Sequence, residues 1–412
     1  MLPLKRLSPE YSYDLLSPSF RQDPHPLLHR LRAEEPVHFS EQIRAWIITR
    51  YDDVLSGLTH PAISADRISP RLLQFPEPDR PKFRPLTRLL AMWALMLDRP
   101  DHNRFRTLIN KAMTRPIIMG FRPMIERIAR EMVDAAISQG GMDAMTGLCV
   151  PLPLYVVSEI IGAPRESIGL LKRCAIDIVN FFGTPPSTYL PTADVAMHSV
   201  VETADYVREL IRQREREPRQ DLISGLLAVR DRGESLEDDE IIATCILMVF
   251  AGFETTSNLL GNGMLLLLQH PEQFARLRSN PSLMRGAVDE ILRYESPVQR
   301  LSRMALDDLQ LRGRTIRKND LLFFMASAAN RDPAMFPEPD RFDITRDSTQ
   351  HIAFGHWIHT CPGSTLAHLE ASIVFGELCR RAPGMRLLRD ETPRWHENLS
   401  VRSLKSLLVR FG

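Results

Sequence analysis

The longest apolar pattern in the chain lies in its second half. Ile241 to Phe250 is almost wholly apolar, and no proline interrupts the stretch from Asp238 to His270, after which Pro271 ends it. Ser235-Leu-Glu-Asp238 resembles a capping box and predicts where this helix begins. At ~1.5 Å per residue the helix would be about 50 Å long. Because Glu254 follows the apolar run closely, we predict a buried core helix and no membrane span.

Elsewhere the pattern predicts more helix than strand. β-Branched and aromatic residues over 37–39 and 45–49 flank a polar break, which predicts a hairpin, and helices are expected beside it over 26–33 and 52–59. Prolines at 70, 76, 78, 81 and 85 predict an irregular segment over 69–97. Helices are expected over 98–140, with a break near Pro116, and over most of 141–270, with a loop at 183–187. A short helix over 281–295, opened by Asn280 and Pro281, should precede strands over 296–325. The remaining expected elements are a long coil over 330–363, a helix over 364–381 and terminal strands such as 406–410.

These elements predict a mainly α fold with a smaller β region (α+β). The β-rich parts are expected at roughly 36–50, 296–325 and 385–412. No Gly/Ser tract, charge block or repeat marks a linker, so we expect one domain over residues 1–412.

The composition excludes some classes of partner. The 52 basic and 51 acidic residues give a net charge of +1, which does not favour nucleic-acid binding. Five cysteines without a spacing pattern indicate a reducing compartment. The first residues form no apolar segment of signal or anchor length. We therefore expect a cytoplasmic protein with no membrane anchor.

One cysteine stands out by its surroundings. The glycine-marked segment from Phe354 to Gly363 places Cys361 just before the helix predicted over 364–381. Unpaired N–H groups and the positive end of a helix dipole favour a thiolate, which is a nucleophile or a metal ligand. Taken alone, a single cysteine is more often buried and inert. A zinc site is disfavoured because no second cysteine lies at ligand spacing and His359 at i−2 is too close.

The long helix contains a second unusual segment, Ala251 to Thr256. Glycine and adjacent threonines are poor helix formers, and the Glu254 carboxylate needs a partner if it is buried. Local rules broken together often mark a functional site. For this segment alone, a kinked helix with a solvated Glu254 is an equally good interpretation.

Together these segments resemble the cytochromes P-450, the haem-thiolate monooxygenases, over about residues 22 to 410. The motifs follow the family's order along the chain: His102 and Arg106, Ala251 to Thr256, Glu290 to Arg293, Pro339 to Phe342, and finally Phe354, Gly355, His359, Cys361, Gly363, Leu366, Ala367 and Glu370. Five motifs in order make a chance match very improbable.

The resemblance implies a triangular helical domain around haem b, with Cys361 as the axial ligand of the iron. It assigns the haem propionates and the haem pocket to His102, Arg106, Ala251, Gly252, Arg303, Phe354, His359 and Gly363. It also implies that Thr255 delivers a proton during oxygen activation and that Glu254 relays protons from solvent. Glu290, Arg293 and Arg341 would have a structural role in which Arg341 completes the ion pair.

The resemblance further implies the reaction: one atom of O2 enters a C–H or C=C bond of an apolar substrate, by hydroxylation or epoxidation. The pocket would be lined by Trp93, Met96, Leu247, Phe250, Ala251, Val298 and Val401. Electrons would come from NAD(P)H through a ferredoxin and its reductase, or a flavodoxin, docking near basic residues such as Arg104 and Lys111. Analogy to similar proteins suggests a role in secondary-metabolite biosynthesis.

Two other functional classes stay open. A haem-thiolate peroxygenase or isomerase would need no reductase and would tend to lack the acid and alcohol at Glu254 and Thr255. A non-catalytic haem sensor would need neither an apolar pocket nor a proton relay.

The cysteine loop departs from the family pattern at three positions. Trp357 replaces a glycine, so a Cβ restricts the backbone where glycine is usual. His368 stands where an arginine is usual, and Pro362 has no N–H to offer the sulfur.

We predict that Pro362→Ala raises the reduction potential of the bound haem. The new N–H would donate to the sulfur and make the thiolate less electron-donating. Potentiometric titration of both proteins measures the difference, and equal potentials would contradict the expectation.

Overall fold

The structure is a computed structural model that describes residues 13–184, 189–230, 236–388 and 392–411. Its helices are α1 (Pro18–Gln22), α2 (His25–Glu34), α3 (Tyr51–Thr59), α4 (Ile68–Gln74), α5 (Arg80–Ala91), α6 (Asp101–Ala112), α7 (Arg115–Gly120), α8 (Arg122–Ser138), α9 (Pro151–Ile161), α10 (Ile168–Gly183), α11 (Tyr189–Arg216), α12 (Leu222–Arg230), α13 (Asp238–Gln269), α14 (Pro271–Ser279), α15 (Met284–Tyr294), α16 (Ala326–Ala329) and α17 (Ser364–Arg381). Shorter helical turns are η1 (Glu77–Asp79), η2 (Ala94–Met96), η3 (Met145–Cys149), η4 (Arg165–Ser167), η6 (Pro281–Leu283) and η7 (Trp357–His359).

The strands are β1 (Val37–Ser40), β2 (Ala45–Ile48), β3 (Ile63–Ser64), β4 (Gly141–Asp143), β5 (Leu301–Ala305), β6 (Leu309–Leu311), β7 (Arg314–Ile316), β8 (Leu321–Phe324), β9 (Arg386–Leu387) and β10 (Leu408–Arg410). The largest sheet has the order β1-β2-β8-β5-β3, in which only β2 and β8 are parallel. The predicted hairpin over 37–49 is confirmed as β1 and β2.

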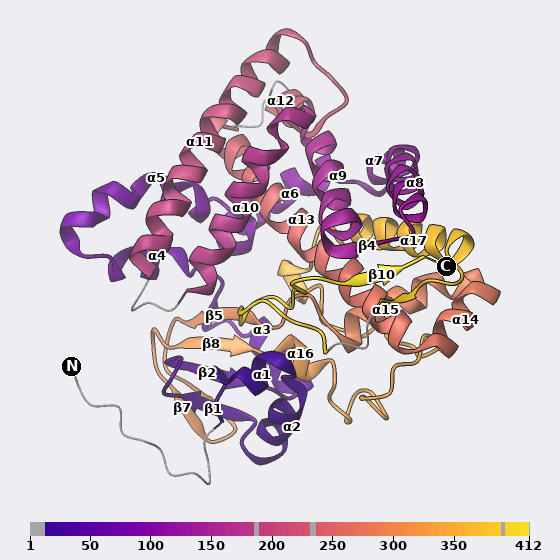
Figure 1. Cartoon of the computed structure of the whole chain (residues 1–412). Helices are drawn as coiled ribbons and strands as arrows, with labels where there is room; N and C mark the ends of the chain where they lie inside the picture. The colour runs from indigo at the N-terminus through magenta and orange to yellow at the C-terminus, as the bar shows by residue number, and fades with distance from the viewer. Residues whose placement is uncertain (1–12, 185–188, 231–235, 389–391, 412) are drawn as a thin grey trace.

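Two apolar faces explain why this sheet is covered by helices on both sides. Along β8, Leu322 and Phe324 join the cluster that includes α3 and α16, while Phe323 joins the cluster that includes α1 and α2. Consecutive apolar residues in a strand are typical of a sheet buried on both faces. Figure 1 shows this sheet beside α1, α2 and α16, apart from the large helical region.

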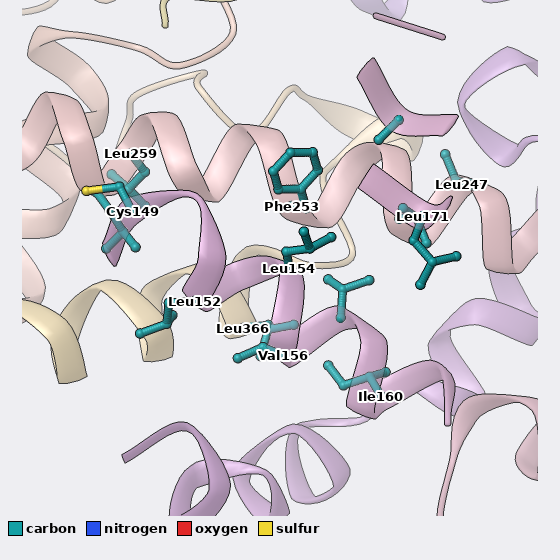
Figure 2. Close-up of a cluster of buried hydrophobic side chains, with 14 of the residues drawn as sticks. Cys149, Leu152, Leu154, Val156, Ile160, Leu171, Leu247, Phe253, Leu259 and Leu366 are labelled. Atoms are coloured by element: carbon teal, nitrogen blue, oxygen red, sulfur yellow. The ribbon is translucent and has the colours of Figure 1, made fainter. Parts of the chain in front are cut away.

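Helix α13 runs through the helical region, as the apolar pattern predicted (Figure 1). It packs against α9, α10, α11 and α17. Figure 2 shows Phe253 and Leu259 of α13 among apolar side chains of α9 and α17. Among the described helices α13 alone has the length and apolarity of a membrane span, but 61% of the tested window is buried inside the fold. It is therefore a core helix.

The start of α13 corrects one expectation. Ser235 lies outside the described residues, and the helix begins at Asp238 with Glu237 as N-cap. The capping box joins Glu237 and Glu240, and Arg104 donates to both carboxylate oxygens of Glu240. Arg104, expected as a docking residue, is therefore engaged in holding the end of α13.

The segment over 69–97 is mostly helical, contrary to the expectation of an irregular loop. It contains α4, η1, α5 and η2. Pro81 lies in the first turn of α5, where the missing N–H costs nothing, and only Pro85 falls inside the helix. The burial of Phe83, Leu86 and Leu90 stabilises α5 despite that proline.

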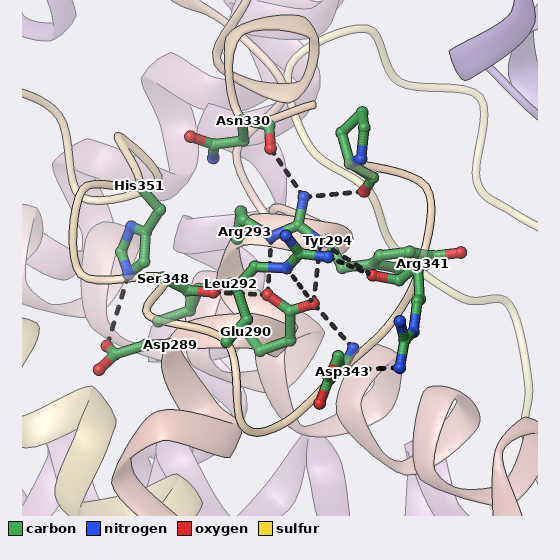
Figure 3. Close-up of polar contacts among 12 residues, drawn as sticks. Asp289, Glu290, Leu292, Arg293, Tyr294, Asn330, Arg341, Asp343, Ser348 and His351 are labelled. Carbon is green, nitrogen blue, oxygen red and sulfur yellow. Dashed lines mark hydrogen bonds and ion pairs between the residues drawn. The ribbon is translucent and has the colours of Figure 1, made fainter. Parts of the chain in front are cut away.

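The coil over 330–363 is confirmed, and a buried ion pair fixes it to α15. Arg293 donates to both carboxylate oxygens of Glu290, at 2.7 and 2.9 Å, and both side chains are completely buried. Arg293 also donates to the carbonyl oxygens of Asn330 and Pro339 in the coil, at 3.0 and 2.9 Å (Figure 3). Two elements far apart in the sequence are thus joined by one guanidinium.

The arginine that completes this pair is not the expected Arg341. The side chain of Arg341 is exposed and pairs with Glu338 and Asp343, and only its carbonyl faces Arg293. Arg346 is the residue whose guanidinium lies 3.4 Å from Glu290. The coil folds back on itself between the two arginines, which a linear motif cannot show.

The expectation of one domain stays a prediction. A single apolar cluster that extends from Ile68 to Phe411 is consistent with it, because the cluster draws on residues from most of the chain.

We predict that Glu290→Gln lowers the free energy of unfolding by about 3–5 kcal/mol, because it leaves a buried guanidinium without its counter-charge. The matched control is Arg341→Ala, which removes only exposed ion pairs and should cost under about 1 kcal/mol. Urea unfolding followed by circular dichroism measures both. Equal losses of unfolding free energy in the two variants would show that Arg341, the partner predicted from the sequence motif, stabilises the ion pair after all.

Candidate active site

The cysteine loop is fixed by its own backbone. The Cys361 N–H donates to the carbonyl of Phe354 at 2.8 Å, closing the loop just before α17. Gly355 has a φ of +73°, and a Cβ there would lie 3.1 Å from the carbonyl of His359. The loop therefore needs glycine at this position to turn so tightly.

The environment of the Cys361 sulfur differs from the expected thiolate site. Burial raises the pKa of the Cys361 thiol, against the opposing effects of the Gly363 N–H, the Arg106 guanidinium and the Ser364 N–H. The start of α17 thus does not by itself make a thiolate. A coordinated metal ion, in contrast, deprotonates a thiol outright.

Trp357 adopts the strained backbone that its replacement of glycine predicted. Its φ is +57°, in the left-handed region that side chains with a Cβ avoid. The guanidinium of Arg99 lies 4.9 Å from the centre of the indole ring, and the ring is 46% exposed. A cation–π contact thus offsets part of the backbone cost.

The segment from Ala251 to Thr255 is the accessible part of an otherwise buried helix. Ala251 is exposed, and Glu254 and Thr255 are half-buried, whereas almost every residue from Leu259 to Leu267 is buried. The Thr255 hydroxyl donates to the Ala251 carbonyl at 2.7 Å. Because Phe253 points into the core between them, the accessible side chains share one face of the helix.

Glu254 carries a buried carboxylate oxygen for which the described residues provide no hydrogen-bond partner. Burial raises its pKa from 4.5 to about 7. The carboxyl group is therefore poised to exchange a proton near neutral pH, which matches the requirement for general acid–base work.

Gly252 is needed for packing. A Cβ at this position would lie 2.8 Å from Cγ2 of Val157 in α9, closer than real contacts allow. The glycine thus lets α13 approach α9. The accessible face around Ala251 depends on this close approach.

Four basic residues predicted from separate motifs come together near the loop. The rings of His102 and His359 lie 4.6 Å apart, and Arg106 donates to the carbonyl of Thr360. Burial, followed by the charges of Arg303, His102, Arg67 and Arg106, lowers the pKa of His359 to about 2. Burial also lowers the pKa of Arg303 to about 10, although Asp98 opposes the shift. These groups repel one another's charge and suit anionic partners.

Arg67 belongs to the same cluster, and the sequence analysis missed it. It donates to the Ser302 carbonyl at 3.2 Å and to the sulfur of Met96 at 2.9 Å. Its position before α4 carries no motif, so only the fold reveals that it faces His359.

The comparisons with known proteins agree with this geometry. The family model for cytochrome P450 matches residues 170–381. The cytochrome P450 monooxygenase PikC of Streptomyces venezuelae is 35% identical over 409 residues, which cover 96% of this chain and 93% of that protein. This chain belongs to the cytochrome P450 family. It is accordingly a haem-thiolate monooxygenase, an oxidoreductase that uses haem iron and O2.

Two further relatives support the same placement. The polyketide biosynthesis cytochrome P450 PksS of Bacillus subtilis is 34% identical over 401 residues, which cover 95% of this chain and 96% of that protein. The solved structure of P450BioI in complex with an acyl carrier protein has a TM-score of 0.88 at 34% identity, covering 96% of this chain and 99% of that one. The α+β fold predicted from the sequence is therefore confirmed as the cytochrome P450 fold.

The described residues fit haem at three points. Cys361 is a half-buried sulfur in a closed loop. Ala251 is a small, exposed residue on α13, while Gly252 faces Val157 of α9 and lets the two helices approach. The cluster of His102, Arg106, Arg303 and His359 supplies the donors that two propionate carboxylates need away from water.

The expected pocket residues divide into two groups. Phe250, Val298 and Val401 are half-buried, and a β-bridge joins Val298 to Val401. Leu247 is 8% exposed, but Trp93 and Met96 are only 1% and 3% exposed. The Trp93 ring packs 4.9 Å from the ring of Phe250. Contrary to expectation, Trp93 and Met96 thus belong to the core and present almost no surface to a substrate.

We predict that the Glu254 carboxyl titrates at a pH of about 7. Infrared difference spectra should show the protonated-carboxyl band lost as the pH rises from 6 to 8, and Glu254→Gln should abolish that change. Relative to Glu254→Gln, the free energy of unfolding should fall as the pH rises from 4.5 to about 7, because the unfolded carboxyl ionises first. A pH-independent band would contradict the expectation.

We also predict that Trp357→Gly is more stable than Trp357→Ala by about 1 kcal/mol, because only glycine adopts a positive φ without strain. Both variants lose the contact with Arg99, so the difference between their free energies of unfolding reports only the cost of the backbone conformation. Urea midpoints compare them. An alanine variant as stable as the glycine variant would show that the loop does not require this conformation.

Proposed function

We propose that Cys361 is the axial ligand of haem iron and that the basic cluster around His359 binds the propionates. When bound, the haem supplies the activation of O2 that lets one oxygen atom enter a C–H or C=C bond. The protein's own part is to bind and orient an apolar substrate, limit the access of water and supply protons.

The observation that carries this proposal is Glu254, a half-buried residue whose carboxyl group has one buried oxygen without a described partner and a raised pKa, beside the Thr255 hydroxyl. Both lie on the accessible face of α13. A haem sensor has no use for a costly unpartnered carboxyl group, and a peroxygenase or isomerase needs no delivered protons. The pair therefore favours a monooxygenase that is supplied with electrons.

Each of the two residues has a distinct role. The Thr255 hydroxyl donates to the Ala251 carbonyl and can rotate to donate into the site instead. Glu254, with a pKa of about 7, can release a proton towards the site and regain one from solvent through water. Arg106, Arg303, His102 and His359 orient the cofactor, and Glu290 with Arg293 keeps the cysteine loop in place.

The proposed substrate is a hydrophobic secondary metabolite. Phe250, next to Ala251 in α13, and the bridged pair Val298 and Val401 are half-buried apolar side chains that the proposal assigns to the substrate pocket. One relative is named for polyketide biosynthesis, and a solved relative binds an acyl carrier protein with hexadec-9Z-enoic acid. We infer a polyketide or a comparable acyl-derived molecule, oxidised by hydroxylation or epoxidation.

The proposed electron donor is a ferredoxin with its NAD(P)H-dependent reductase, or a flavodoxin, in the cytoplasm. It would dock on the cysteine side of the haem, near Lys111 and the exposed Trp357 ring. Arg104 is a weaker candidate for this surface, because Glu240 engages its guanidinium.

The experiment that tests the proposal is Thr255→Ala with Thr255→Ser as the matched control. Apolar compounds are first screened for a shift of the Soret band, and the best ligand is then turned over with a ferredoxin and its reductase. We expect Thr255→Ala to keep consuming NAD(P)H while product per NAD(P)H falls at least about tenfold and peroxide rises, because proton delivery is lost.

Thr255→Ser should keep most of the coupling, since it retains the hydroxyl. Unchanged product yield in Thr255→Ala would contradict the role of Thr255. Product formation with peroxide alone, at the same rate without reductase, would favour the peroxygenase alternative.

A further inference from the structure

We propose that Asp289 and His368 form a buried ion pair that positions Phe354, and through Phe354 the cysteine loop. His368 is then a positioning residue for Cys361, a role that nothing in its motif assigns. The inference rests on the proposed function, because it concerns the geometry of the proposed iron ligand.

The pair joins two helices beneath the loop. Asp289 of α15 is 6% exposed, and its Oδ1 lies 2.6 Å from Nε2 of His368 in α17, which is 8% exposed. Asp289 precedes Glu290, so it extends the buried polar network that fixes the coil to α15. Hydrogen bonds from the His351 and His368 rings hold the pKa of the Asp289 carboxyl well below its usual range, against the effect of burial.

The partners of His368 determine its charge. Its Nδ1 lies 2.9 Å from the carbonyl oxygen of Ser364, and its Nε2 faces the ionised carboxylate of Asp289. Both partners can only accept a hydrogen bond, so both ring nitrogens must donate. His368 therefore satisfies its surroundings only as an imidazolium.

His351 differs from His368 in this respect. Its Nδ1 accepts from the N–H of Ala353 at 3.2 Å, so that nitrogen carries no proton. Its Nε2 lies 3.5 Å from the same oxygen of Asp289 (Figure 3). His351 is thus a neutral donor, and the unit of Asp289, His351 and His368 contains one anion and one cation.

The two imidazole rings enclose Phe354. The ring of Phe354 lies 5.6 Å from the ring of His351 and 5.3 Å from the ring of His368. The carbonyl of Phe354 is the group that accepts from the Cys361 N–H at 2.8 Å. Phe354 thus contacts both imidazole rings through its side chain and Cys361 through its backbone. The ion pair therefore acts on Cys361 through two steps of direct contact.

The test uses the haem-loaded full chain and three variants: His368→Gln, His368→Arg and His368→Arg combined with Asp289→Asn. Arg380→Gln, which breaks an exposed pair on α17, is the matched control. Two quantities are measured: the rate at which the thiolate-type Soret band of the reduced carbon monoxide complex is lost in mild urea, and the reduction potential of the haem.

We expect His368→Gln to lose the thiolate band at least about tenfold faster than the parent, because the buried Asp289 charge loses its counter-ion. Its reduction potential should fall, since the remaining anion favours the more oxidised iron. His368→Arg should match the parent within about twofold in the rate and keep the potential. Adding Asp289→Asn should abolish this rescue, and Arg380→Gln should change neither quantity.

The proposal is overturned if His368→Gln matches the parent in both quantities, or if His368→Arg decays as fast as His368→Gln. If His368→Gln does not retain haem, the two arginine variants are compared instead. The proposal then requires that His368→Arg behaves like the parent and that adding Asp289→Asn abolishes this rescue. A parent protein without a thiolate-type band would refute the proposed function itself, whereas a normal parent band with unaffected variants would refute only the role of His368.

Discussion

The cysteine loop depends on the buried ion pair between Glu290 and Arg293. The loop follows a coil that lacks regular structure from Asn330 to the start of η7, and such a coil cannot hold a side chain in place by itself. Arg293 binds the coil at two carbonyl groups, while Glu290 accepts from the Asp343 N–H and the Ser348 hydroxyl. Cys361 can then occupy a fixed position because the chain before it is fastened to α15.

The site combines two electrostatic environments that must stay separate. Around His359, burial and the neighbouring positive groups lower the pKa of the imidazole, which suits the proposed binding of the haem carboxylates. On α13, burial raises the pKa of Glu254 to about 7, which prepares a group that exchanges protons. Burial drives both shifts, and its sign follows from whether the charged form is a cation or an anion.

Much of this arrangement follows from local sequence. The bounds of α17 and the position of Cys361 could be predicted, because helix and loop signals are local. The backbone strain at Trp357 was predictable, because Trp357 stands at a position of the family's loop where glycine is usual and a positive φ is therefore expected. The helices within 69–97, Arg346 as the partner of Glu290 and Arg67 beside His359 could not be predicted. Whether a helix tolerates a proline and which distant charges pair both depend on tertiary packing. Tertiary packing cannot be derived from the local pattern of a single sequence.

The proposed binding of haem iron by the Cys361 thiolate can be tested with the absorption spectrum of the reduced protein with carbon monoxide. The parent and the Cys361→Ala variant are compared after purification with haem. We predict a strongly red-shifted Soret band in the parent that is absent from the variant, because only a thiolate ligand produces that shift. The same unshifted band in both proteins, typical of imidazole ligation, would contradict the account.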